Sequence, residues 1–303
     1  MIQTYIFVAR SDYNFISQTL PSLFEICKRA QAHVSLVLDT KEPIGVLSKT
    51  LKQSGFQLLQ CLLEDLAQKY GFELILADYQ KQQIRSNNRI QFNYPHRETH
   101  CFRGYPIFGS FKQFLDTDWK YILHLDCDMI FYEEPYFSWV KEGIKIMEEN
   151  EDILCVLPRG GPPTKDGYLQ QGTTPYRVDK KRGLYLFKNF TSRHYLIHRE
   201  RFLSLLPLKP LWLSWREPIK SRLFGNGKML CWETMIEEAL KKSDMWRADL
   251  MTDQAWSLHP GDRSEEFYKL LPQIIDSVNS NEFPDEQRGH FDLRLCDWKL
   301  FLN

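Results

Sequence analysis

The sequence predicts an α/β fold with a mostly parallel sheet flanked by helices. Through the first half of the chain, short apolar runs with β-strand character alternate with longer helical patterns, as in parallel strands joined by helices. Several of these runs end on a charged residue, as strands do when their carboxyl ends line a ligand crevice. At 303 residues, the chain is long enough for one large domain with a substantial core. We therefore treat residues 1–303 as a single domain with two halves, 1–135 and 136–303.

The first half contains most of the expected parallel strands. Strands are expected at residues 4–9, 33–38, 73–77 and in the run 120–132, and helices at residues 17–29, 44–53, 56–70 and 105–115. Residues 79–103 are polar and rich in Asn, Gln and Arg, so we expect them to form a loop over the sheet edge.

The second half has a less regular pattern. Strands are expected at residues 153–157 and 191–198, and helices at residues 135–150, 229–241 and 264–277. The segment from about 159 to 190 is rich in Gly and Pro and has no sustained period. It is expected to be a long loop or irregular hairpin of the kind that covers a site.

Composition excludes several classes of function. Lys+Arg and Asp+Glu both number 39, so net charge favours neither nucleic acid nor an anionic membrane as the main partner. Seven cysteines without a C-x-x-C pair argue for reduced thiols and against a disulfide framework or zinc site. No apolar stretch approaches the roughly 20 residues that cross a bilayer, and no signal peptide is evident, so we expect a cytoplasmic protein. The apolar segment 211–215 leaves a weak peripheral membrane contact open.

The most informative motif is a pair of acids at the end of the apolar run 120–132. Asp126 and Asp128 are one residue apart, and in an extended chain they point to the same side. Such carboxylates repel each other unless a divalent cation or donor groups neutralise them. A second Asp-x-Asp, Asp116 and Asp118, precedes the run, where a helix end or polar turn explains it. We therefore predict a ligand site at Asp126 and Asp128 only.

Two further charged residues follow the first two strands. In a parallel sheet, Arg10 and Asp39 should converge on the same crevice as the acid pair. Asp39 is a candidate to accept a hydrogen bond from a base or ribose hydroxyl, or it caps the turn that follows. We expect Arg10 either to face a diphosphate or to pair with Asp39. Arg103 precedes a Gly and a helix start, where a phosphate contact or an ordinary helix start both fit.

These motifs, in this order, resemble those of a known enzyme family. Arg103-Gly-Tyr-Pro followed by Tyr121-Ile-Leu-His-Leu-Asp-Cys-Asp-Met, together with the opening strands, resembles the GT-A-fold glycosyltransferases, particularly the inverting family 2 type. The resemblance covers roughly residues 3 to 135. It implies a GT-A-like, Rossmann-type sheet, with a nucleotide-sugar donor half followed by an acceptor-side extension.

The resemblance also implies roles for individual residues. Asp128 would hold the donor diphosphate through Mn²⁺ or Mg²⁺, and Asp126 would contact ribose or the metal. Oxygen ligands suit these hard cations. Glu233, at the start of a helix, matches the place of the family's catalytic base, where the usual form is Asp preceded by another acid. A helix N-terminal Glu stabilised by the helix dipole explains Glu233 equally. His259, after a late strand, matches a further metal ligand.

We therefore predict a metal-dependent, hexosyltransferase-type glycosyltransferase. It would transfer a sugar from a nucleoside-diphosphate sugar to a hydroxyl acceptor, such as a glycan, a lipid-linked acceptor or a small molecule, with inversion. Two alternatives remain open. A sugar-phosphate nucleotidyltransferase usually has a Gly-rich basic loop after its first strand, whereas this chain has Arg10-Ser-Asp-Tyr-Asn. A catalytically inactive nucleotide-sugar-binding protein is the other alternative.

Overall fold

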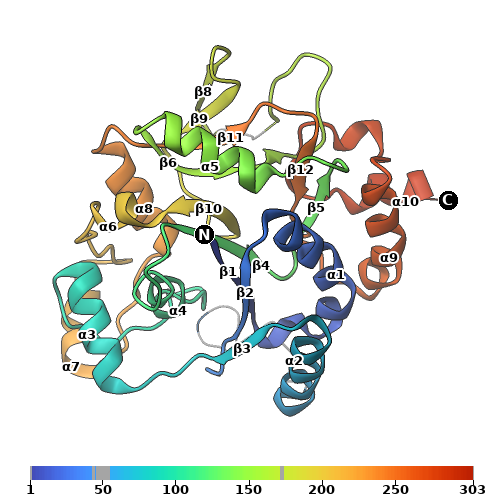
Figure 1. Ribbon diagram of the computed structural model, residues 1–303. Coiled ribbons are helices and arrows are strands. Elements are labelled where there is room, and N and C mark those ends of the chain that lie inside the picture. The colour runs from blue at the N-terminus through green and yellow to red at the C-terminus, as the bar shows by residue number, and fades with distance from the viewer. Residues whose placement is uncertain (1, 43–44, 46–54, 171–173, 303) are drawn as a thin grey trace.

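The computed structural model describes residues 2–42, 45, 55–170 and 174–302 and has a nine-stranded sheet at its centre (Figure 1). In spatial order the strands are β3 (Glu73–Leu76), β2 (His33–Leu38), β1 (Ile2–Val8), β4 (Tyr121–Asp126), β10 (His194–His198), β6 (Ile153–Leu157), β11 (Trp246–Leu250), β9 (Leu184–Phe187) and β8 (Tyr176–Asp179). All of these strands except β9 and β10 run in the same direction. The predicted α/β class with a mostly parallel sheet is therefore confirmed.

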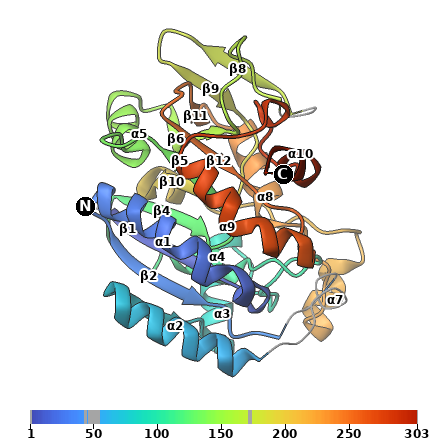
Figure 2. The ribbon, with the colours of Figure 1, turned by 90° about the vertical axis from the view of Figure 1, so that its right-hand side faces the viewer.

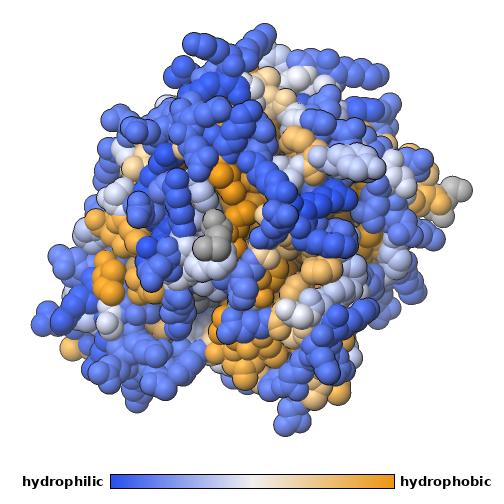
Figure 3. Space-filling model, viewed as in Figure 1, coloured by the Kyte–Doolittle hydropathy of each residue, from blue (hydrophilic) through white to orange (hydrophobic). Residues whose placement is uncertain are grey.

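Helices cover both faces of this sheet because alternate strand residues point to opposite sides. On one face Ile6 and Leu123 pack with α1 (Tyr13–Ala30), α2 (Phe56–Tyr70) and α5 (Trp139–Glu149). On the other face, Tyr5 and Ile122 belong to a second hydrophobic cluster. The helices of that face are α3 (Lys81–Phe92), α4 (Phe108–Lys112), α6 (Arg199–Leu203) and α8 (Trp232–Lys241). Figure 3 shows a mainly hydrophilic face with hydrophobic patches near its centre and in its lower part.

A smaller, three-stranded sheet packs beside the large one. It consists of β5 (Ile130–Glu133), β12 (Ala255–Leu258) and β7 (Arg159–Gly160), with β12 in the middle. Buried side chains of β5 and β12, including Trp256, pack against α9 (Glu265–Asn279) and α10 (Leu295–Leu302). This cluster fixes the segment after β12 beside the carboxyl end of β4.

Short elements complete the described structure. The loop after β1 forms a 3-10 turn, η1 (Arg10–Asp12); a second such turn is η3 (Asp285–Gln287), and α7 (Glu217–Phe224) lies at the periphery. Figure 2 shows α7 at the edge of the molecule toward which the arrowhead of β2 points. None of the described helices combines the length and apolar character needed to cross a membrane.

The prediction of a loop at 79–103 is wrong, because α3 occupies much of this segment. Its buried residues are Ile84, Asn88, Gln91 and Phe92, at helical spacing, but two of them are amides, so the apolar period that marks a helix is weak. The helix expected at 105–115 shortens to α4, and the one expected at 44–53 lies outside the described residues, Gly45 apart.

The irregular segment near 159–190 contains more sheet than expected. Its residues include β7 and the β8–β9 hairpin, and every residue of β9 is buried against β11. Sequence reasoning also missed β11, α6, α7 and α10. The remaining predicted strands and helices are present with their ends shifted by a few residues.

Candidate functional site

The candidate site lies at the carboxyl ends of β1 to β4, where open α/β sheets bind their ligands. Asp39 follows β2, and its backbone N–H donates to Val8 O at the end of β1 (3.0 Å). Asp126 ends β4 and pairs in register with Phe7 of β1. Asp39 and Asp126 therefore stand on either side of the same central strand, as the parallel topology predicts.

Asp39 is the centre of a polar cluster. Tyr79 OH donates to its Oδ1 (2.7 Å), as does the backbone N–H of Lys41 (3.0 Å), and His100 Nε2 lies 2.9 Å from its Oδ2. Burial alone would raise the pKa of Asp39, but the hydrogen bond and charge of His100, with the Tyr79 and Lys41 bonds, outweigh it and lower the pKa. Asp39 is therefore an ionised acceptor, and His100 donates to it.

Sequence reasoning missed the partners of Asp39. Tyr79 and His100 lie in the segment that was expected to be a loop, and nothing in their local pattern distinguishes them. Lys41 Nζ contacts Thr99 Oγ1 and lies 5.6 Å from the centre of the Tyr79 ring. Burial lowers the pKa of Lys41, while the charges of Asp39 and Glu98 oppose that shift. An aromatic ring, a carboxylate and a cation thus meet beside the end of β2.

The acid pair lies on a turn between β4 and β5, not on one extended strand. The N–H of Met129 donates to Asp126 O (3.2 Å), so the chain bends directly after Asp126. The expectation that Asp126 and Asp128 share one side of a strand is therefore wrong. Burial raises the pKa of Asp126, and the negative charge of Asp128 raises it further, while His124 and Arg193 act to lower it. The two acids therefore still interact electrostatically.

The two acids differ in their partners. The Asp126 side chain is 33% exposed, and its Oδ1 lies 3.2 Å from His124 Nε2. The Asp128 side chain is only 11% exposed, and its Oδ2 forms an ion pair with Arg263. Its Oδ1 is buried and has no hydrogen-bond partner within the described part of the chain. A buried carboxylate oxygen without a partner is the kind of group that a cation would satisfy.

A third acid, Asp12, adjoins the pair. Its Oδ2 accepts hydrogen bonds from Ala9 N (2.7 Å) and Cys127 Sγ (3.2 Å). Burial, with the charge of Asp128, raises the pKa of Asp12 to about 6. Sequence reasoning missed Asp12 because a residue just after a strand reads as an ordinary turn acid.

The structure does not gather the expected set of metal ligands. Across the described ranges, no three His, Cys, Asp or Glu side chains lie close enough to hold an ion together. His259 instead faces Asp292, with 2.9 Å between Nδ1 and Oδ1, and stacks on Phe291. Mg²⁺ is commonly held by one or two carboxylates, substrate phosphates and water, so Asp126 and Asp128 alone still fit such an ion.

Within the described residues, the contacts of the two predicted phosphate-binding arginines are with residues other than the acid pair. Arg10 does not pair with Asp39; its guanidinium binds Glu42 Oε1 (2.6 Å) and Thr40 O (2.7 Å). Arg103 is exposed and lies over the Phe102 ring at 5.6 Å. The adjoining Gly104 has a φ of 106° and closes a turn onto Cys101 O (2.9 Å). The turn therefore accounts for the glycine, because its positive φ favours glycine.

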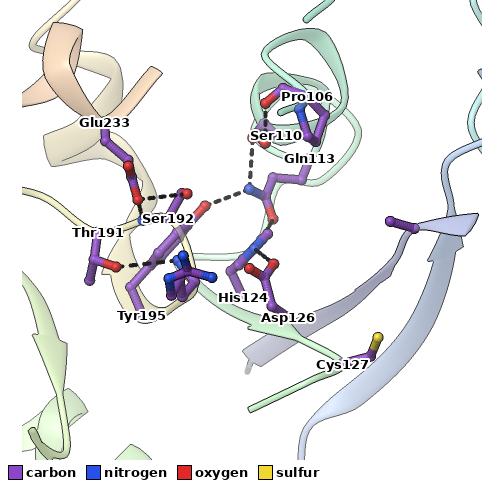
Figure 4. A network of polar contacts seen from close by, with 12 residues as sticks. Pro106, Ser110, Gln113, His124, Asp126, Cys127, Thr191, Ser192, Tyr195 and Glu233 are labelled. Atoms are coloured by element: carbon purple, nitrogen blue, oxygen red, sulfur yellow. Dashed lines mark hydrogen bonds and ion pairs between the residues drawn. The ribbon is translucent and has the colours of Figure 1, made fainter. Parts of the chain in front are cut away.

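Glu233 lies in the first turn of α8 and binds the segment before β10. Its Oε1 accepts hydrogen bonds from Ser192 N (2.7 Å) and Ser192 Oγ (2.9 Å), as Figure 4 shows. Within the described residues, Oε2 has no hydrogen-bond partner. One oxygen therefore fixes the carboxylate and the other is available to take a proton.

A buried network lies between Glu233 and Asp126 (Figure 4). His124 Nδ1 lies 3.3 Å from Gln113 Oε1, and Gln113 Nε2 donates to Tyr195 OH (2.6 Å). The rings of His124 and Tyr195 stack at 4.8 Å. His124 is therefore the hydrogen-bonded core histidine that its position inside a strand indicates.

No protein-family model and no curated relative matches the sequence. Similar solved structures include UDP-glucose pyrophosphorylase complexed with UDP-glucose (TM-score 0.43, 9% identity, covering 93% of this chain and 98% of that one). Others are S. aureus TarS with UDP-GlcNAc (0.42, 11%, 91% and 66%) and an active-site mutant of LgtC (0.41, 8%, 95% and 99%). All three TM-scores lie below 0.5.

Proposed function

We propose that this protein is a metal-dependent glycosyltransferase of the GT-A type that uses a nucleoside-diphosphate sugar. The observation that carries the proposal is the placement of ionised Asp39 and of the Asp126–Asp128 turn on either side of β1. A nucleotide lying across the carboxyl end of β1 would meet one carboxylate at its nucleoside and two at its diphosphate.

Asp39 would bind the nucleoside. Its lowered pKa keeps it ionised, so it accepts hydrogen bonds from a base N–H or a ribose hydroxyl. Tyr79 and His100 orient this carboxylate and supply ring surface beside it. Hydrogen bonds to an ionised acceptor are about twice as strong as neutral ones, which suits recognition of a polar nucleoside.

Asp126 and Asp128 would hold Mn²⁺ or Mg²⁺ together with the diphosphate. When bound, such an ion neutralises the charge that develops on the departing nucleoside diphosphate. Arg263, which is bound to Asp128, is placed to exchange that carboxylate for a phosphate oxygen. His259, whose Nδ1 faces Asp292, is proposed as a further ligand that would have to move toward the ion, because no three such side chains among the described residues lie close enough to hold one together.

Glu233 would act on the acceptor. Direct displacement at the anomeric carbon needs a base within reach of the acceptor hydroxyl, and inverts the configuration. Ser192 fixes the carboxylate through Oε1, which leaves Oε2 to take the proton. The transferred group would be a hexose, and the acceptor a hydroxyl of a glycan, a lipid-linked sugar or a small molecule.

The test is isothermal titration with a panel of nucleoside-diphosphate sugars in the presence of Mn²⁺, followed by a transfer assay. We expect one donor to bind, and Asp128→Asn to reduce transfer by about a hundredfold or more. Asp118→Asn is the matched control, because Asp118 is fully exposed in the other Asp-x-Asp motif. Absence of donor binding would refute the proposal. So would release of pyrophosphate from a nucleoside triphosphate and a sugar phosphate, which is the nucleotidyltransferase reaction.

A further inference from the structure

A basic cavity lies away from the acid pair, between α3, the segment 94–97 and α7. Its volume is about 620 Å³, and its lining includes Arg85, Arg89, Arg97 and Arg222. No carboxylate lines the cavity, and within the described ranges none of these four guanidinium groups pairs with an acid. Four unpaired guanidinium groups around one hollow create a positive potential that attracts anions, most strongly phosphates.

The floor of the cavity is held rigidly. Glu98 is buried and accepts hydrogen bonds from Ser221 Oγ (2.6 Å) and Gly227 N (2.9 Å), which bind α7 and its following loop to the segment 94–98. Its Oε2 also accepts a hydrogen bond from Arg97 N (3.2 Å) and lies 3.2 Å from His96 Nδ1. These partners neutralise or hydrogen-bond the Glu98 carboxylate beneath the cavity, and Glu98 itself is not part of the cavity lining. His96 lines the cavity, and its buried Nε2 has no hydrogen-bond partner among the described residues.

The outer face of α7 is apolar and exposed. Leu223 is 62% exposed and Phe224 70%, and Ile219, one helical turn before Leu223, is also exposed. Glu217 and Ser221 lie on the buried face of the same helix, opposite Ile219 and Leu223, and Phe224 is the last residue of the helix. Trp215, in the loop before the helix, is 75% exposed. Exposed large apolar side chains gathered on one short helix are typical of surfaces that enter a membrane interface.

Charge and apolar surface occur together at this place. Arg216 and Arg222 are exposed on or beside α7, and Arg222 also lines the cavity. Lys220 is exposed as well, but its Nζ pairs with Glu217 Oε1 (2.9 Å). A helix with apolar residues outward and basic residues at its flanks lies in the plane of an anionic membrane surface rather than across it. The combination of arginines without acidic partners and exposed Trp, Leu and Phe side chains favours a phospholipid surface.

We propose that α7 and residues 213–216 dock on a membrane that carries anionic phospholipids, with the arginine cavity receiving their phosphate head groups. Figure 2 shows α7 on the side of the molecule toward which the arrowhead of β2 points, so docking would bring the candidate site near the bilayer. The inference rests on α7 and the cavity and does not depend on the reaction proposed for the acid pair.

The experiment is co-sedimentation of the full chain with vesicles. Vesicles of phosphatidylcholine with phosphatidylglycerol should bind the protein, and vesicles of phosphatidylcholine alone should bind it much less. Binding should weaken as salt is raised, because salt screens the attraction between arginines and head groups. Equal binding to both kinds of vesicle, or none to either, would overturn the proposal. Thermal stabilisation by inorganic phosphate without sedimentation would also overturn it, since the cavity would then serve a soluble anion.

Variants separate the two parts of the surface. Leu223→Ser with Phe224→Ser should abolish sedimentation, because it removes the side chains that enter the interface. The matched control is Leu300→Ser with Phe301→Ser, an exposed Leu-Phe pair on α10 that should leave binding unchanged. Equal loss in both double variants would contradict a role for α7.

The charge test uses Arg85→Gln with Arg89→Gln. Each basic residue near an anionic surface contributes about a fivefold factor to partitioning, so the double variant should bind about 25-fold more weakly. Lys145→Gln with Arg177→Gln removes the same charge from exposed positions elsewhere and should have little effect. Unchanged melting temperatures would establish that each variant is folded. If both double variants bound the vesicles equally weakly, net charge alone would explain the loss, and the proposed role of the cavity would be refuted.

Discussion

Arg263 and Asp128 form an ion pair that joins the turn before α9 to the turn after β4. The guanidinium of Arg263 also donates to Pro260 O (2.5 Å) and lies 4.2 Å from the centre of the Phe15 ring. Arg263 is thus held in place by its own loop and by α1. Its positive charge occupies one oxygen of Asp128, where the proposed cation would also bind, so the two positive charges compete for the same carboxylate.

Replacement of Arg263 should therefore strengthen binding of the metal alone. In Arg263→Gln, we expect Mn²⁺ without nucleotide to bind about two- to fivefold more tightly, a modest gain because the arginine is partly exposed. Electron paramagnetic resonance of free Mn²⁺ measures this directly. Arg294→Gln, which breaks the pair with Asp297, is the control and should leave Mn²⁺ affinity unchanged. Weaker Mn²⁺ binding in Arg263→Gln would contradict competition at Asp128.

The Asp39 cluster gives a second prediction. Asp39→Asn removes the ionised acceptor and should weaken nucleoside-diphosphate binding by about tenfold to a hundredfold, the usual range for a hydrogen bond to a charged group. Isothermal titration with the best-binding diphosphate measures the loss. Asp78→Asn is the matched control, since Asp78 is an exposed acid that follows the neighbouring strand β3. If both variants bind as the wild type does, Asp39 does not contact the nucleoside.

Much of the sheet could be predicted because its signals are local. β1, β2, β4 and β6 are short apolar runs, and burial on both faces makes them almost continuously hydrophobic. The positions of Asp39 and Asp126 followed from parallel topology alone. By contrast, α3 buries Asn88 and Gln91, and β11 buries Arg247 and Asp249 as an ion pair, so polar residues there do not indicate exposure.

The site was predicted less completely because its contacts are long-range. Tyr79 and His100 reach Asp39 across 40 and 61 residues, and Arg263 reaches Asp128 across 135. No periodicity connects such positions, since they meet only through the packing of α3, α9 and the sheet. The turn after Asp126 also escaped prediction, because Cys127 and Met129 are apolar and continue the hydrophobic run of β4.

Glu98 gives a prediction of pH dependence. Burial would raise its pKa, but hydrogen bonds from His96, Ser221 and Gly227 outweigh burial and lower it. A lowered pKa in the folded state means that this carboxylate stabilises the protein above pH 4.5, its ordinary value, and that the contribution is lost as the pH falls through the lowered value. The free energy of unfolding should therefore fall as the solution is acidified below pH 4.5.

Glu98→Gln tests this directly. The neutral amide should cost about 1–3 kcal/mol at pH 7, because it leaves the N–H of Gly227 or the hydroxyl of Ser221 poorly paired. The difference between wild type and variant should narrow in acid, which urea unfolding across the pH range measures. Glu148→Gln, at an exposed residue near Lys120, should cause neither effect. A difference that stays constant with pH would show that Glu98 contributes through shape and not through charge.

Glu233 carries the prediction that bears most on chemistry. Glu233→Gln keeps an oxygen to accept from Ser192 but removes the group that could take a proton, so transfer should fall by about 10²–10⁴-fold while donor binding is unchanged. The ratio of transfer rate to donor affinity separates a base from a binding residue. Glu237→Gln, on the same helix and paired with Lys241, is the matched control. If Glu233→Gln weakens donor binding and leaves the rate at saturation intact, the carboxylate positions Ser192 and the β10 segment, and the base must be sought elsewhere.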